Sequence, residues 1–126
     1  MRHLIPTLTL GTLCAALSPL AVQADNYRCV TGGYCTNDLE CHPDETIFVI
    51  QTDKSGMARF GWDEPDAALF EGEGRRLAHM TVWHQSDGAA TQTLVLADNL
   101  QATFTVSAYI DTFLYTSLQS LTCVRQ

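Results

Sequence analysis

The densest group of chemically capable side chains follows a cysteine in the N-terminal half of the chain. Cys41, His42, Asp44 and Glu45 lie within five residues of one another, and thiolate, imidazole and carboxylate are all metal ligands. An imidazole beside carboxylates is also a pairing used in general acid–base catalysis. The segment therefore raises two alternatives: a metal site, and a small hydrolase that uses carboxylate and histidine chemistry. A metal carrier would be built on His42, His79 or His84.

Two further histidines, His79 and His84, lie five positions apart on one predicted strand. Side chains alternate between the faces of a strand, so these two point to opposite sides and do not ligate one metal ion unless a bulge intervenes. At least one of them should be exposed. A structural or solvent role is favoured for both, and the sequence assigns no metal ligand.

Acidic residues cluster in the middle of the chain, at Asp63, Glu64, Asp66, Glu71 and Glu73. Their spacing does not match the D-x-[DN]-x-[DN]-G pattern of a calcium loop, and a solvated loop is the favoured interpretation. A binding surface for a basic protein is the alternative.

Motifs of nucleophilic or cofactor chemistry are missing from the sequence. It contains no G-x-S-x-G elbow, H-E-x-x-H motif, phosphate-binding glycine loop or Cys-x-x-Cys pair. Aromatic residues are more often core than pocket lining in a small β domain, and the ones weighed are Trp62, Trp83, Tyr109 and Tyr115. We assign no catalytic or cofactor-binding residue and expect a protein that is not an enzyme.

The first 24 residues have the features of a secretion signal. Arg2 precedes an apolar stretch over residues 4–20, and Val22-Gln23-Ala24 provides small residues where a signal peptidase needs them. We expect cleavage after Ala24, which leaves one domain over residues 25–126 in the periplasm or outside the cell. After cleavage no segment is long and apolar enough to insert into a membrane.

The cysteines that remain after cleavage are Cys29, Cys35, Cys41 and Cys123. An even number in a short exported chain indicates disulfides, and the Cys-x5-Cys-x5-Cys spacing differs from that of structural zinc sites. Three pairings are possible. We favour Cys35–Cys41, which closes a short polar loop, with Cys29–Cys123, which joins the first strand to the last.

Charge excludes some partners. The whole chain has a formal net charge of −7, and loss of Arg2 with the signal makes it −8. Nucleic acids and anionic membranes are bound through Lys and Arg, so neither is an expected partner. A basic protein is compatible with this charge, and the domain is expected to be monomeric.

Alternation of apolar and polar residues, with turn signals every eight to twelve positions, predicts an antiparallel all-β domain. Gly72-Glu73-Gly74 is predicted to be a turn, and residues 108–112 a connection or a bulge. The predicted strands cover residues 27–31, 46–52, 57–62, 67–71, 76–85, 91–97, 101–107 and 113–124. Seven or eight strands, with the first and last joined by the favoured Cys29–Cys123 disulfide, suggest a closed or nearly closed barrel. A two-sheet sandwich is the alternative.

Two resemblances involve the cysteine frame. The Tyr27-Arg28-Cys29 start and the Leu121-Thr122-Cys123 ending resemble small exported β proteins of Gram-negative bacteria that carry no assigned activity. The same frame is similar to that of the periplasmic inhibitors of C-type lysozyme, which implies a β-barrel fold. The Ser-Gly-x-x-Tyr inhibitory loop of that family has no counterpart here, so the resemblance implies no site residue.

Together these features predict an exported, non-enzymatic binding or interaction module. The alternatives are the small hydrolase and metal carrier described above, and a protein similar to the lysozyme inhibitors.

Overall fold

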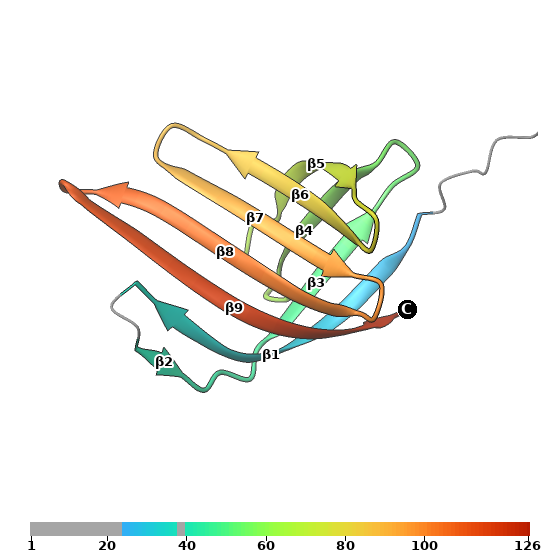
Figure 1. Cartoon of the computed structure of the whole chain (residues 1–126), viewed down its shortest axis with the longest axis horizontal. Coiled ribbons are helices and arrows are strands. Elements are labelled where there is room, and N and C mark those ends of the chain that lie inside the picture. Colours follow the sequence, from blue (N-terminus) through green and yellow to red (C-terminus); the bar gives the residue numbers. More distant parts are fainter. Residues whose placement is uncertain (1–23, 38–39) are drawn as a thin grey trace, which may run out of the picture.

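A computed structural model describes residues 24–37 and 40–126. The predicted signal over residues 1–24, apart from Ala24, lies outside the described residues. In the described part of the chain the strands form an antiparallel sheet in the order β2-β1-β3-β4-β5-β6-β7-β8-β9, and β1 also pairs with β9. That last pairing closes eight strands into a barrel and leaves β2 as an additional strand beside β1 (Figure 1). The barrel is therefore confirmed over the sandwich.

The strand bounds follow the sequence order along the chain. They are β1 (Asn26–Thr36), β2 (Cys41–His42), β3 (Ile47–Thr52), β4 (Met57–Trp62), β5 (Phe70–Arg76), β6 (Met80–Ser86), β7 (Ala90–Ala97), β8 (Gln101–Ile110) and β9 (Phe113–Arg125).

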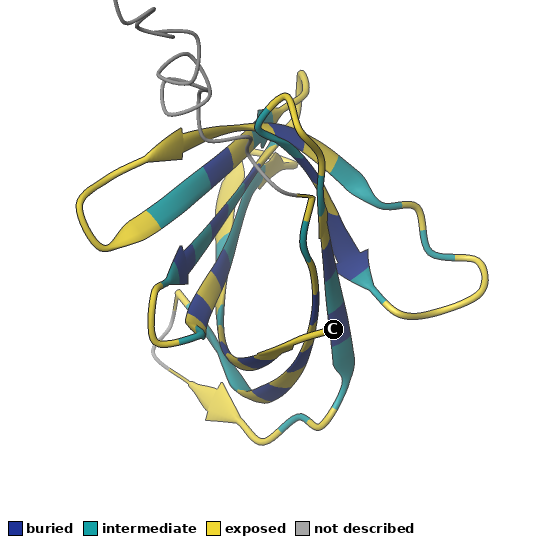
Figure 2. Cartoon of the chain, turned by 90° about the vertical axis from the view of Figure 1, so that its right-hand side faces the viewer, coloured by how far each residue is buried: buried dark blue, intermediate teal, exposed yellow. Residues whose placement is uncertain are grey.

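The barrel interior is filled by side chains from alternate positions along its strands. Figure 2 shows buried and exposed positions following one another along most strands, as a closed sheet with one wet face requires. Aromatic rings form the centre of the core: Phe48 lies 4.9 Å from Phe104 and 5.1 Å from Trp62 between ring centroids. Trp83 is also buried, as predicted for a core aromatic residue.

Gly72 and Gly74 lie inside β5, so the predicted turn at Gly72-Glu73-Gly74 is wrong. Close approach of neighbouring groups explains both glycines. A Cβ on Gly74 would lie 2.5 Å from the Gly56 carbonyl oxygen and 2.6 Å from Trp83 Nε1, and a Cβ on Gly72 would lie 2.8 Å from the His84 carbonyl oxygen. At both positions glycine allows neighbouring groups to come close to β5, which is one of the reasons why glycine occurs within a strand.

The predicted strand over residues 76–85 is also divided. Arg76 ends β5, residues 77–79 turn the chain, and β6 begins at Met80. Over residues 108–112, which were predicted to be a connection or a bulge, β8 continues to Ile110 and the turn is limited to Asp111 and Thr112. The β8–β9 hairpin is consequently longer than expected.

Both favoured disulfides are present. Cys29 and Cys123 are opposite each other on β1 and β9, at the seam that closes the barrel. Cys35 and Cys41 are opposite each other on β1 and β2. Two disulfides fit an oxidising location outside the cytoplasm.

The antiparallel order sorts the connections between two ends of the barrel. One end, called the acidic end below, holds the β1–β2, β2–β3, β4–β5, β6–β7 and β8–β9 connections. The opposite end holds the β3–β4, β5–β6 and β7–β8 turns and the C-terminus. In Figure 1 the β8–β9 tip and the β6–β7 turn lie at the left and the C-terminus at the right.

Candidate functional site

The most unusual surface of the barrel is the projecting end of the β8–β9 hairpin. Six large apolar side chains near its tip are exposed to solvent, at 38–61 % of their full accessibility. We call them the hairpin patch; its members are Tyr109, Ile110, Phe113, Leu114, Tyr115 and Leu118. Exposed apolar groups that gather on one projecting hairpin of a small protein indicate an interaction surface.

The hairpin projects because its neighbours end earlier. Strand β7 begins at Ala90, opposite Ala108, and β1 ends at Thr36, opposite Ser117. The tip is a two-residue turn in which Asp111 and Thr112 both have positive φ, at 49° and 66°. This conformation matches the twist of two flanking strands, so the turn extends the hairpin without splaying it.

The two faces of the hairpin present different side chains. Phe104 and Leu121 point into the core, so by alternation Ile110, Phe113 and Tyr115 continue the inner face beyond the barrel rim. Tyr109 and Leu114 pair with each other on the outer face. The inner-face group therefore overhangs the open end of the barrel.

A hollow of about 360 Å³ lies at this overhang, and we call it the mouth. Strand β1 provides Tyr34 and β2 provides His42. The centroids of these two rings are 5.2 Å apart. The lining residues are Tyr34, Thr36, Asn37, Glu40, His42, Phe113 and Tyr115. Such a size is at the lower end of the range for ligand pockets.

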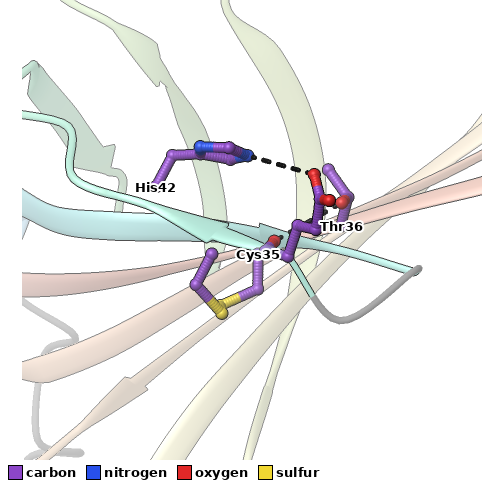
Figure 3. The surroundings of a disulfide bond; sticks show 5 residues. Cys35, Thr36 and His42 are labelled. Carbon is purple, nitrogen blue, oxygen red and sulfur yellow. Dashed lines mark hydrogen bonds and ion pairs between the residues drawn. A yellow bond between two sulfur atoms is a disulfide. The ribbon is translucent and has the colours of Figure 1, made fainter.

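Polar contacts hold the walls of the mouth in place. His42 Nε2 lies 3.8 Å from a carboxylate oxygen of Glu40, and Figure 3 shows His42 beside Thr36 and the disulfide of Cys35. On the opposite wall, Asn37 Nδ2 donates to the Leu114 carbonyl oxygen at 3.1 Å. The mouth is thus formed by segments that are tied to one another across the hairpin.

Charge is distributed unequally between the two ends. In the described residues, none of the connections at the acidic end contains Lys or Arg, and their acids are Glu40, Asp44, Glu45, Asp63, Glu64, Asp66, Asp87 and Asp111. Cations lie toward the opposite end: Lys54 in the β3–β4 turn, Arg75 and Arg76 at the end of β5, and Arg125 at the end of β9.

Some of these acids have partners. Asp63 accepts a hydrogen bond from Arg28 at 2.9 Å, and Asp44 accepts one from the Thr46 hydroxyl. Hydrogen bonds from the backbone N–H groups of Ala89 and Ala90 lower the pKa of Asp87 below its ordinary value, which keeps that turn negatively charged.

The acidic cluster predicted from the sequence is divided by the fold. Asp63, Glu64 and Asp66 lie in the β4–β5 connection at the acidic end, whereas Glu71 and Glu73 are exposed on β5. The proximity in sequence therefore does not produce a single carboxylate site.

The three histidines considered as ligands are separated. His42 lies at the mouth, and His79 lies in the β5–β6 turn with its side chain 89 % exposed. His84 lies on the outer face of β6, and neither ring is buried. No group of three or more His, Cys, Asp and Glu side chains comes together among the described residues.

His84 makes a contact that the sequence did not indicate. Its Nε2 lies 2.8 Å from the Ser86 hydroxyl and its Nδ1 lies 2.9 Å from the Thr93 hydroxyl. A serine beside an imidazole resembles a nucleophile and its base. His84 is exposed on the face of its strand. Its second ring nitrogen contacts the Thr93 hydroxyl, whereas in hydrolases a carboxylate orients the histidine base.

A larger hollow, of about 480 Å³, lies against the outer face of β6 to β9. None of its lining residues is charged, and its walls include Met80, Val95, Thr103 and Thr122. It lacks both the aromatic overhang and the charge of the mouth, so it provides less basis for selecting a ligand.

The sequence did not identify the hairpin patch. Tyr109 and Tyr115 were weighed as core residues, and that interpretation is wrong because both lie beyond the barrel rim. An available signal was the run of consecutive apolar residues on both sides of Asp111-Thr112, where simple alternation breaks down.

No family model matches this sequence, and the searches found no matching curated protein or solved structure. In the described part of the chain, no helix has the length and apolar character needed to cross a membrane.

Proposed function

We propose that this protein is an exported, non-enzymatic interaction module that binds a basic protein with its acidic end. The observation that carries the proposal is the hairpin patch, an exposed group of apolar side chains at an end whose connections contain acids and no Lys or Arg in the described residues. Export through the predicted signal to the periplasm or the medium is part of the same proposal.

Apolar contact supplies most of the affinity in this account. Burying one large apolar side chain against a partner contributes about 1.5–3 kcal/mol, whereas an exposed ion pair contributes about 0–1 kcal/mol. The acids contribute mainly to the rate of association and to the choice of partner, because complementary charge steers encounters and penalises wrong ones.

Charge also argues against self-association through this surface. A second copy of the chain would bring the same acids, such as Asp111, Glu40 and Asp87, against one another. A partner with Lys and Arg around an apolar surface would pair with the acids of this end and cover the hairpin patch. The protein is therefore proposed to act as a monomer that captures such a partner.

Nuclear magnetic resonance titration of the purified, oxidised protein tests this proposal. The probe is a ten-residue peptide of alternating leucine and arginine, and its matched control alternates leucine and glutamate. We expect amide shift changes in β1, β2 and the β8–β9 hairpin with the arginine peptide only. Equal binding of the two peptides, or changes confined to the β3–β4, β5–β6 and β7–β8 turns, would contradict the proposal.

A further inference from the structure

We infer that the mouth is a subsite that accepts a cationic side chain of the partner, with arginine preferred over lysine. This inference rests on the proposed function and specifies how one partner residue is recognised. Its basis is the mouth itself, where rings from β1 and β9 and a carboxylate from the β1–β2 connection surround one hollow of about 360 Å³.

The rings provide the first argument for a cation. Tyr34, Phe113 and Tyr115 line the same hollow, and the face of each ring carries partial negative charge. A cation within about 6 Å of such a face is attracted to it, most strongly when it is desolvated. Three rings around one hollow allow more than one of these contacts at once.

The carboxylate provides the second argument. Glu40 lines the mouth and lies 3.8 Å from His42 Nε2, so it is placed at the wall rather than directed away from the hollow. Among the described residues, no Lys or Arg lines the mouth. The carboxylate of Glu40 would repel an anionic ligand, whereas it would attract a cationic one.

Arginine fits the mouth better than lysine because of the shape of its charge. The planar guanidinium stacks on an aromatic face and presents several N–H donors at its edge. A group stacked on Tyr34 or Tyr115 therefore keeps donors available for Glu40. The ammonium of lysine is more strongly hydrated and loses more solvation in an apolar hollow.

The test uses two small probes, N-acetyl-Gly-Arg-Gly amide and the same tripeptide with citrulline, which has nearly the same shape without the charge. Binding is followed through the ring signals of Tyr34, His42 and Tyr115. We expect the arginine probe to shift these signals and to bind roughly tenfold more tightly than the citrulline probe.

Three variants locate the effect. Tyr115→Leu keeps apolar bulk but removes a ring, and Glu40→Gln removes the charge; each is expected to weaken the arginine probe several-fold. His79→Leu is the matched control, because it removes an exposed ring from the β5–β6 turn at the opposite end of the barrel, and it should leave this affinity unchanged.

The outcomes separate the two proposals. Equal binding of the arginine and citrulline probes, or unchanged affinity in Tyr115→Leu, would overturn the subsite while the leucine–arginine peptide still bound the acidic end. If that longer peptide also fails to bind, the proposed function and the subsite both fall.

Discussion

Cys35 on β1 and Cys41 on β2 face each other in the strand ladder and are joined by a disulfide. The next pair in the same ladder is Tyr34 and His42, the two rings on one wall of the mouth. Strand β2 is only two residues long, and the disulfide in the neighbouring ladder pair helps to keep His42 beside Tyr34.

Replacing Cys35 and Cys41 together by alanine should therefore impair binding more than folding. A loop this short is worth roughly 2 kcal/mol in the chain-entropy model, and the barrel strands do not depend on β2. We expect the barrel to remain folded in denaturant titrations while the arginine probe loses affinity. Unchanged binding by the double variant would contradict the role of this disulfide in shaping the mouth.

The disulfide at the barrel seam should have the opposite effect. Cys29 and Cys123 are separated by 94 residues in sequence, and a cross-link of that length is worth about 4–5 kcal/mol. Alanine at both positions should lower the free energy of unfolding by about this amount, measured with urea under oxidising conditions. A loss smaller than that caused by removing Cys35–Cys41 would contradict this ranking.

Gly74 should tolerate no side chain, because a Cβ there would approach the Gly56 carbonyl oxygen and Trp83. Gly74→Ala is expected to lower the free energy of unfolding by about 1–3 kcal/mol. The matched control is Gly88→Ala in the β6–β7 turn, where a Cβ meets no atom within 4 Å. The pair is compared by thermal unfolding, and equal melting temperatures would refute the close approach of β5 and β6.

Acidification should lower the free energy of unfolding slightly, because it protonates Asp53 and Asp87 in two of the turns. A hydrogen bond from Ser55 lowers the pKa of Asp53, and backbone N–H groups lower that of Asp87, from an ordinary value of 3.8. The stabilisation is present above that ordinary value and is lost as pH falls through the lowered pKa values. The effect is small because both side chains are exposed.

A double variant, Asp53→Asn with Asp87→Asn, isolates this contribution. Its free energy of unfolding should depend less on pH than that of the unmodified protein between pH 4 and pH 2. The measurement is a set of urea titrations across that interval. Identical slopes for the two proteins would mean that neither aspartate is linked to folding.

Local patterns were sufficient for an antiparallel all-β domain and for the favoured disulfide pairing, whereas the choice of barrel over sandwich needed the β1–β9 pairing. The strand over Met57–Trp62 matches the prediction at both ends because period-two alternation and the Asp53–Gly56 turn signal agree there. The turn predicted at Gly72 and Gly74 was wrong because glycine occurs both in turns and where neighbouring groups come close to a strand. Only the positions of Gly56 and Trp83 show that the second reason applies here.

The candidate site was beyond the reach of such patterns. The exposure of Tyr115 depends on where β7 and β1 end, and the mouth depends on the position of His42 on a two-residue strand. The separation of charge between the ends was implicit in the sequence. It becomes visible only when the alternation of strand direction assigns each connection to one end.

Photo-crosslinking in the cell is the most direct test of binding by the acidic end. A photoreactive residue is placed at Leu114 in the hairpin patch and, as a control, at Lys54 in the β3–β4 turn of the opposite end. We expect an adduct with a basic protein from Leu114 and none from Lys54. The absence of an adduct from Leu114, equal adducts from both positions, or an acidic partner would contradict it.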